Sequence, residues 1–356
     1  MVDLPFDLVS ACSKRIEKVM NPRIAFSYYV STKLPFHYNR VPAAIRNRLL
    51  RTRSVDPDLS RHFANEKARM ILVESFRKLG FVLLRKNPPS LHVTHDIETE
   101  EGLRKALSLK AVEEELGIES TWFLPSHEYR ISKSVATDLS RGGMIGSHDI
   151  KHDGKLIHLR KRAELVKRLR ASRVKLEEIF EQDVNCFRSP LLQFSRRIIS
   201  ALNEAGYRLD FSIPCWEPVH PVTMCGFGIE SAQPFEAEGV VEIPLTLFQD
   251  HQVFNLMRLN FRDAVKLWID QAKLIRSLDA DLVLLVHPDY SFSRDLRAYK
   301  ELLERLLQIV SSNRYRSEDS SQSGKVQQMN RDGRQLLTRQ SVDTDQPFSC
   351  RSTQEF

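Results

Sequence analysis

Short apolar runs alternate with stretches of helical periodicity over most of the chain. Residues that recur every three to four positions predict helices, and short runs rich in β-branched and aromatic residues predict strands. The predicted strands are 91–94, 120–124, 144–147, 186–188, 209–213, 240–247 and 282–286. The predicted helices are 102–116, 134–141, 159–181, 195–205, 261–278 and 297–310. Repeated strand–helix alternation predicts an α/β fold in which parallel strands form a sheet or a barrel.

The pattern differs at both ends of the chain. Residues 1–55 show no clean period, residues 58–84 read as a helix, and Asn87-Pro88-Pro89-Ser90 then interrupts the chain. From about residue 313 Ser, Gln, Arg and Asp dominate, and the apolar periodicity is lost. We therefore expect an N-terminal extension at 1–88, a catalytic domain at 89–312 and a disordered tail at 313–356.

Composition narrows the class of protein. The 356 residues are 42% hydrophobic and 28% charged, as in an ordinary globular protein. Five cysteines with wide spacing and no C-x-x-C pattern predict neither a disulfide framework nor a structural zinc site. No apolar signal segment is seen at the N-terminus, and the longest apolar run, Leu282 to Val286, is too short to span a bilayer. These features favour a cytoplasmic location.

Positive charge is concentrated near the N-terminus. The formal net charge is +7, and residues 1–88 hold 17 Lys and Arg against 7 Asp and Glu. Such a segment is either an ordinary solvated surface or a peripheral contact for an anionic membrane or phosphate groups. No nucleic-acid-binding motif accompanies the charge, so we expect no nucleic-acid partner.

Ionisable residues stand just after the predicted strands. In α/β barrels the reactive groups gather at the C-terminal ends of the strands, so this position is typical of an active site. The residues so placed are Asp96, Glu98, His148, Arg188, Asp210 and His287.

Two pairs among these suggest metal chemistry. His148 and His152 are spaced i, i+4, which on a helix would put both imidazoles on one face, within reach of one metal. Asp96 and Glu98 are spaced i, i+2 and would project to the same side of an extended segment, where one could bind a metal and the other act as a base. Either pair alone also has a structural explanation, as core histidines or as a capping carboxylate.

Taken together and in order, the motifs resemble the polysaccharide deacetylase family of NodB-like carbohydrate esterases. The family shows T-F-D-D, H-[ST]-x-x-H, R-x-P-[YW], an aspartate-containing motif and L-x-H. The matching stretches are 94–98, 148–152, 188–191, 209–212 and 285–287, within a resemblance that covers 91–310. Two departures stand out: the spaced pair Asp96-x-Glu98 replaces the adjacent aspartates, and Leu191 replaces the aromatic residue.

The resemblance implies a distorted (β/α) barrel that binds a divalent metal, with zinc expected. Glu98, His148 and His152 would be the ligands, and Asp96 the general base. The alternative arrangement makes Asp96 the ligand and Glu98 the base. Arg188 would pair with Asp96 and keep it ionised.

The remaining roles implied by the resemblance concern the substrate. The backbone N–H of Leu191 would help to stabilise the oxyanion. His287, helped by Asp210, would protonate the leaving amine. Trp216 could stack on a sugar ring or belong to the core.

The expected activity is hydrolysis of an N-acyl group, N-acetyl above all, from an amino sugar or glycan intermediate. Two alternatives stay open at this point. The fold also serves amidohydrolase chemistry on small cyclic amides, and a non-catalytic carbohydrate-binding protein could retain the fold without the metal.

Overall fold

A computed structural model describes residues 6–22, 66–84, 89–216, 228–229, 231–289 and 292–312. The described residues up to Val310 belong to one compact unit. The predicted tail at 313–356 and most of the basic N-terminal segment lie outside the described residues. None of the helices described combines the length and apolar character needed to cross a bilayer.

Nine strands form one sheet in the order β1-β7-β8-β6-β5-β4-β3-β2-β9. The strands from β8 to β9 in that order are mutually parallel, whereas β7 pairs antiparallel with both β8 and β1. Their bounds are β1 Val82–Leu83, β2 Leu91–Asp96, β3 Thr121–Leu124, β4 Met144–Ser147, β5 Cys186–Phe187, β6 Leu209–Asp210, β7 Phe235–Ala237, β8 Val240–Glu242 and β9 Leu282–Val286.

The sheet does not close by strand pairing alone. An irregular segment after β8 spans the gap between β6 and β9. The N–H of Leu245 donates to the carbonyl of Ile213 at 2.9 Å, and the N–H of Leu247 donates to the carbonyl of Val283 at 3.2 Å. The predicted α/β fold of the distorted (β/α) barrel type is confirmed, with described strands that do not pair into a closed ring.

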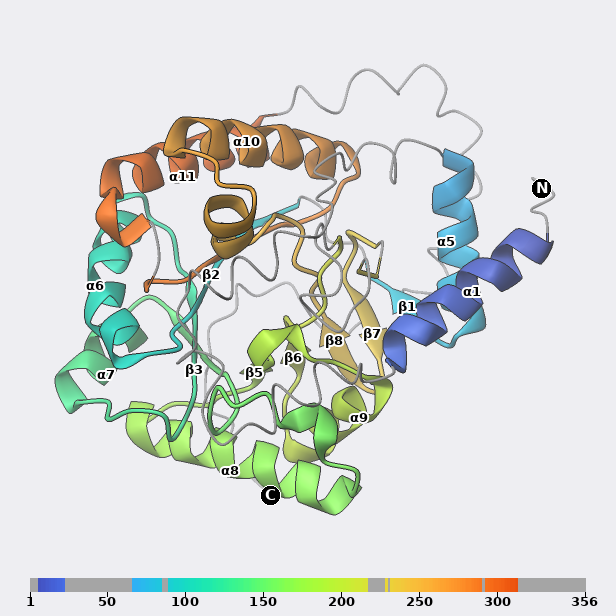
Figure 1. Ribbon diagram of the computed structural model, residues 1–356, viewed down its shortest axis with the longest axis horizontal. Helices are drawn as coiled ribbons and strands as arrows, with labels where there is room; N and C mark the ends of the chain where they lie inside the picture. Colours follow the sequence, from blue (N-terminus) through green and yellow to red (C-terminus); the bar gives the residue numbers. More distant parts are fainter. Residues whose placement is uncertain are drawn as a thin grey trace, which may run out of the picture. The chain divides into compact units, whose positions relative to one another are not determined.

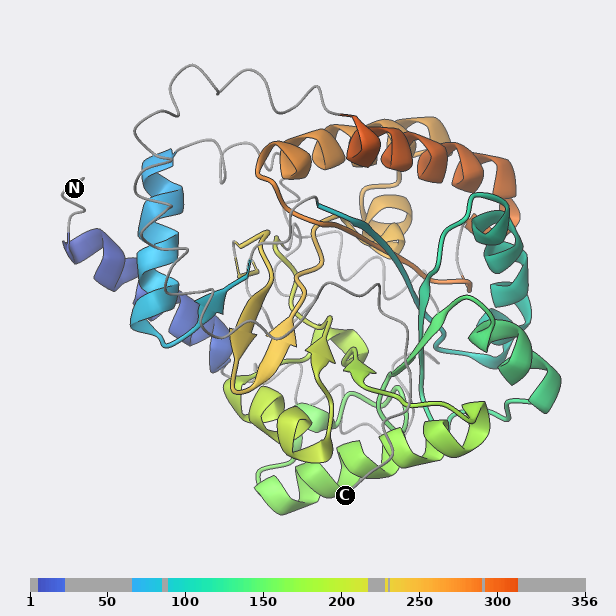
Figure 2. The ribbon, with the colours of Figure 1, turned by 180° about the vertical axis from the view of Figure 1, so that it is seen from behind.

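Helices surround the parallel strands, as the views from both sides show (Figures 1 and 2). Leu282–Val286, the strand β9, is buried at every position, as expected for a strand covered on both faces. The helices are α6 Glu100–Glu115, α7 Lys133–Ser140, α8 Arg162–Phe180, α9 Arg196–Ala205, α10 Phe261–Ser277 and α11 Leu296–Ser311.

The described N-terminal part consists of α1 (Phe6–Met20), α5 (Glu66–Lys78) and β1. The predicted helix over 58–84 was too long at its C-terminal end, because Gly80 adopts φ +77° after the helix and β1 follows. Phe76 and Phe81 pack against Phe235 of β7, so this part contributes an edge strand and aromatic contacts to the sheet. The predicted division at residue 88 stays a prediction.

Candidate active site

The parallel strands bring the predicted site residues to one end of the barrel. Asp96 ends β2, His148 directly follows β4, Arg188 directly follows β5, and His287 directly follows β9. Gly146 of β4 leaves room for the ring of Phe123 on β3, since a Cβ at this position would lie 2.4 Å from that ring. These four residues therefore lie where the positional rule expects them, and their roles stay predictions.

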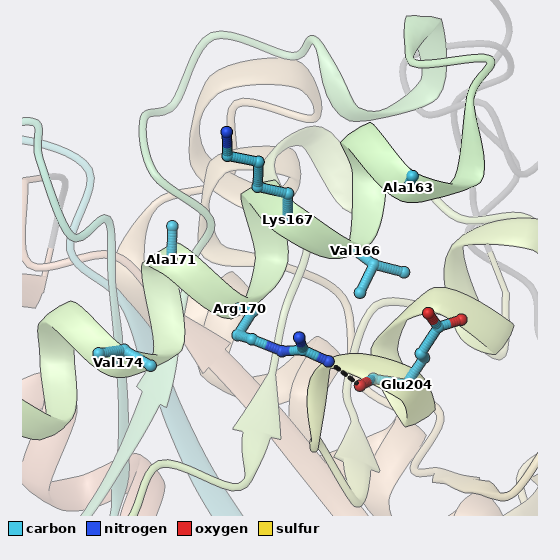
Figure 3. A pocket seen from close by; sticks show the side chains of 7 residues that line it. All are labelled: Ala163, Val166, Lys167, Arg170, Ala171, Val174 and Glu204. Carbon is cyan, nitrogen blue, oxygen red and sulfur yellow. Dashed lines mark hydrogen bonds between the residues drawn. The ribbon is translucent and has the colours of Figure 1, made fainter.

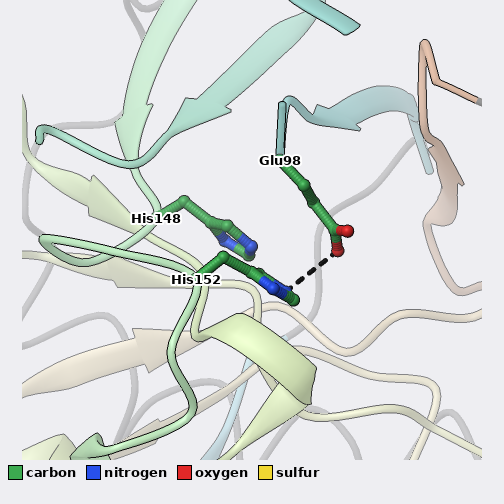
Figure 4. A group of neighbouring side chains, drawn as sticks. All are labelled: Glu98, His148 and His152. Carbon is green, nitrogen blue, oxygen red and sulfur yellow. Dashed lines mark ion pairs between the residues drawn. The ribbon is translucent and has the colours of Figure 1, made fainter. Parts of the chain in front are cut away.

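Glu98, His148 and His152 form a candidate metal centre (Figure 4). One ligand atom from each residue lies within 4.8 Å of the other two. Two imidazoles and a carboxylate are a donor set found in catalytic zinc sites, which hold three protein ligands and leave a position open.

The orientation of His148 fits a metal ligand. Its Nδ1 lies 2.8 Å from the carbonyl oxygen of Arg188, so Nδ1 carries the hydrogen and Nε2 keeps its lone pair. That Nε2 atom is buried and has no hydrogen-bond partner among the described residues. Burial lowers the pKa of His148 to about 4, which keeps the imidazole neutral, as a ligand must be.

Glu98 and His152 form an ion pair, with Oε1 and Nε2 3.0 Å apart. Burial opposes ionisation of both groups, but their mutual attraction outweighs it, lowering the pKa of Glu98 and raising that of His152. A divalent cation binding here would displace the proton shared by this pair.

The segment that carries the two histidines is not a helix, so the two imidazoles do not meet on a helix face. It is irregular, and Asp149 has φ +66°, so the i, i+4 spacing works through a turn. The wholly buried carboxylate of Asp149 accepts three hydrogen bonds of 2.7–3.0 Å from Arg168 of α8. Arg168 also donates to Asp153 at 2.7 Å, and so holds the turn from both ends.

Asp96 and Arg188 are paired inside the barrel. Nη1 of Arg188 donates to Oδ1 of Asp96 at 3.0 Å, and Nε donates to the carbonyl of Phe211 at 3.0 Å. The guanidinium also lies over the ring of Phe123, 4.5 Å from its centroid. Burial would raise the pKa of Asp96, but Arg188 above all holds it below its usual value. Asp96 is therefore held in its ionised form.

The partner of His287 is Asp250 rather than the predicted Asp210. Nδ1 of His287 lies 2.7 Å from Oδ1 of Asp250. Burial would lower the pKa of His287, but the Asp250 carboxylate outweighs it and raises the pKa to about 10. The same positional signal could have found Asp250, because it stands three residues after the predicted strand 240–247.

Asp210 instead faces a second carboxyl group. The register of β6 and β8 sets Asp210 opposite Glu242, and both are completely buried. Asp210 accepts hydrogen bonds from the backbone N–H and the hydroxyl of Ser212. Burial raises the pKa of Asp210 to about 6, and burial together with Asp210 raises that of Glu242. This pair therefore retains a proton and cannot serve His287 as Asp250 does.

The two predicted substrate-binding residues have different surroundings. Leu191 has φ +58° and Leu192 φ +48°, so the loop after Arg188 holds two successive non-glycine residues in the left-handed region. Such strain is concentrated at functional sites. Trp216 is 8% exposed, and its stacking on a sugar stays a prediction, as does the oxyanion role of Leu191.

Residues 85–209 match the polysaccharide deacetylase family, which confirms the resemblance predicted from the motifs. No curated protein matches the chain. A protein from Mycobacterium smegmatis assigned as a polysaccharide deacetylase has a similar structure, with a TM-score of 0.51 and 17% identity over 65% of this chain and 88% of that one. This likeness shows a shared fold.

Two further solved structures have TM-scores below 0.5. The chitin deacetylase from the fungal pathogen Colletotrichum lindemuthianum has a TM-score of 0.43 and 14% identity over 64% of this chain and 85% of that one. A CE4 family pseudoenzyme from Bacillus anthracis has a TM-score of 0.40 and 14% identity over 63% of each chain.

Proposed function

We propose that this chain, whose residues 85–209 belong to the polysaccharide deacetylase family, is a metal-dependent hydrolase that removes an N-acyl group from an amino sugar. N-acetyl is the expected acyl group and zinc the expected metal. One observation carries the proposal: the Glu98, His148 and His152 donor atoms lie within 4.8 Å of one another, in the same site as an ionised acid–base set.

A divalent cation bound there would supply Lewis acidity and would lower the pKa of a water molecule. Asp96, kept ionised by Arg188, is suited to accept the proton of the attacking water. His287, kept protonated by Asp250, is suited to donate a proton to the departing amine. The two groups thus hold the protonation states that amide hydrolysis needs from a base and an acid at neutral pH.

The geometry also assigns supporting roles. The Arg188 carbonyl fixes the tautomer of His148 while its guanidinium holds Asp96, so one residue organises both the metal ligand and the base. Nε2 of His287 lies 3.8 Å from Oε1 of Glu98, and this short distance supports the proposal that His287 acts as the acid next to the metal ligands. We propose Glu98 as ligand and Asp96 as base, because Glu98 pairs with His152 and Asp96 with Arg188.

The test combines metal analysis of purified protein with an amine-release screen over N-acetylated amino sugars and their oligomers. We expect about one divalent metal per chain and amine release from at least one member of the series. His148→Ala should lose both, whereas His127→Ala, an exposed histidine outside the centre, should lose neither. Bound metal without amine release from any member would remove the deacetylase assignment, and full metal occupancy in His148→Ala would remove the ligand set.

A further inference from the structure

A depression near the catalytic end of the barrel is lined by two arginines. Its lining residues are Asn21, Pro22, Ile157, Arg160, Ser195 and Arg197. Residues 157 and 160 belong to the connection from β4 to α8, and residues 195 and 197 to the connection from β5 into α9. Both connections leave the C-terminal ends of their strands, which is the side that carries the metal centre.

The chain limits how far this depression can lie from the site. Ile157 is five residues after His152 and Ser195 is four after Leu191, so their Cα atoms lie within about 18 Å and about 14 Å of those residues. The two connections are also tied together. Gln193 accepts from the N–H of Ile157 at 3.2 Å and donates to the carbonyl of Gly154 at 2.7 Å.

Arg160 and Arg197 repel each other, and none of the carboxylates in the described residues neutralises them. Burial, and then the charge of Arg160, lower the pKa of Arg197. Arg197 donates to the carbonyl of Ile157 at 2.9 Å, and in the described part of the chain neither arginine forms an ion pair. Because each charge disfavours the other, an anion bound between the two guanidinium groups would relieve the repulsion.

The cationic residues next to Arg160 and Arg197 in the sequence form ion pairs with carboxylates. Lys161 pairs with Glu164 at 3.3 Å, Arg162 with Glu204 at 2.8 Å, and Arg196 with Glu238 at 2.6 Å. Lys161 and Arg162 are one and two residues after Arg160, and Arg196 directly precedes Arg197. The missing carboxylate is therefore specific to Arg160 and Arg197 among their described neighbours.

A second depression, between α8 and α9, makes the contrast clear (Figure 3). Its arginine, Arg170, donates to the carbonyl oxygen of Glu204 at 2.8 Å, and the Glu204 side chain lines the same depression. This second depression therefore contains a positively charged and a negatively charged side chain. Arg170 is thus a matched control for loss of one positive charge at a depression.

We propose that Arg160 and Arg197 form a subsite for a phosphate or diphosphate group carried by the amino-sugar substrate. Guanidinium groups bind phosphate oxygens through paired, charge-assisted hydrogen bonds, and the two here are placed on the substrate side of the barrel. The assignment of the anion to a substrate rests on the proposed function. The subsite itself rests on the unneutralised pair.

The binding test uses the metal-loaded full chain and inorganic pyrophosphate in isothermal titration calorimetry. Arg160→Gln/Arg197→Gln should weaken binding at least about 10-fold, which corresponds to about 1.4 kcal/mol, while Arg170→Gln should stay within about twofold of the wild type. Thermal unfolding of each variant checks the fold. Equal binding by the double variant and the wild type would overturn the subsite, including the case in which pyrophosphate binds only at the metal.

Two further probes distinguish the carrier of the phosphate. Uridine diphosphate represents a nucleotide-linked sugar, and phosphatidylglycerol vesicles, compared with phosphatidylcholine vesicles, represent a lipid-linked one. Weaker binding of either probe to the double variant than to the wild type supports the subsite. Equal binding of both probes to the two proteins overturns it.

The kinetic arm tests the link to catalysis. N-acetylglucosamine 1-phosphate should be deacetylated with a higher kcat/KM than N-acetylglucosamine, and only the double variant should lose this preference. If neither sugar is deacetylated, the proposed function fails while pyrophosphate binding still reports on the subsite. If both are deacetylated equally by the wild type, the function stands and the substrate-anchoring role fails.

Discussion

His287 and Asp250 are joined at two points, although 37 residues separate them in the sequence. Oδ1 of Asp250 lies 2.7 Å from Nδ1 of His287, and Oδ2 accepts the backbone N–H of His287 at 2.9 Å. The carboxylate therefore fixes both the position of the ring and its protonated form. Of the ring nitrogens, Nε2 is the one that lies toward Glu98.

Asp250→Asn should move the alkaline limb of the pH profile. In the folded protein the pKa of His287 is raised to about 10, so the acid form is present below that pH and is lost as the pH rises through it. Without the Asp250 charge, burial lowers the pKa and only the smaller effects of Glu98 and Asp96 still raise it, so the alkaline limb should move to lower pH. A return to the ordinary value of about 6.5 would lower the protonated fraction at pH 8 roughly 30-fold. The kcat/KM profile from pH 5 to 10.5 measures this change.

Asp210→Asn is the matched comparison, because Asp210 was predicted to assist His287 and the structure pairs it with Glu242 instead. The alkaline limb of the kcat/KM profile of Asp210→Asn should stay at the same pH as in the wild type. A shift in Asp210→Asn with none in Asp250→Asn would reverse the assignment of the positioning residue.

Position relative to the strands made most of the site predictable from the sequence. Asp96, His148 and His287 follow apolar runs that match β2, β4 and β9 closely, and buried parallel strands give a strong apolar signal. The order of the motifs along the chain then assigned residues that are far apart in the sequence to one candidate site. The spacing of the two histidines was informative, although the turn that carries them could not be distinguished from a helix.

The parts that were missed depend on tertiary contacts. β1 and β7 are two and three residues long and pair antiparallel at the sheet edge, so neither gives a clear period. Position after a predicted strand makes both Asp210 and Asp250 candidates, but the choice between them depends on where the chain runs after β8, which no local pattern encodes. The Arg168–Asp149 contact joins a helix to a loop 19 residues earlier and is likewise invisible to periodicity.

Metal affinity should rise with pH, because bound metal replaces a proton on His152. The pKa of His152 is raised above its usual 6.5, mainly by Glu98 acting against burial, whereas the pKa of His148 is lowered to about 4. Between these two values one proton is displaced per metal, so each unit of pH decrease should weaken apparent affinity about tenfold. Zinc competition with a calibrated chelator from pH 5 to 9 gives this slope. Affinity that does not vary with pH below 6.5 would contradict the ion-pair account.

Arg168→Gln should destabilise the protein because it leaves the Asp149 carboxylate buried without a cation. Removing one partner of a buried pair typically costs about 3–5 kcal/mol. Since burial already raises the pKa of Asp149, the variant can relieve part of this cost by protonation, and its deficit should grow as the pH rises from 5 to 8. The free energy of unfolding in urea at both pH values tests this, and weaker metal binding should accompany it.

Arg104→Gln provides the control, because Arg104 pairs with Glu101 at the surface, where the two side chains are 62% and 51% exposed. Exposed pairs contribute little to stability because water and salt screen the charges, so little change is expected. Combining Arg168→Gln with Asp149→Asn should recover part of the lost stability. An equally small effect of Arg168→Gln and Arg104→Gln would mean that the Asp149 contact does not support the turn.

Asp96→Asn and Glu98→Gln should separate the base from the ligand. The carboxylate of Asp96 is held by Arg188, and that of Glu98 by His152, so the two near-isosteric changes remove different functions. Asp96→Asn should keep the metal and lower kcat by about 10²–10⁴, the usual cost of removing one proton-transfer group. Glu98→Gln should lose metal affinity first, and excess metal should restore part of its activity.

The two measurements must be made on the same preparations, because metal loss alone would also lower the rate. Asp96→Asn at full metal occupancy and with near-normal turnover would exclude Asp96 as the base. An empty centre in Asp96→Asn beside a filled one in Glu98→Gln would establish the reverse arrangement, with Asp96 as ligand and Glu98 as base. The Arg188–Asp96 pair argues against that outcome, since a carboxylate already bound to a buried guanidinium has less negative charge to offer a cation.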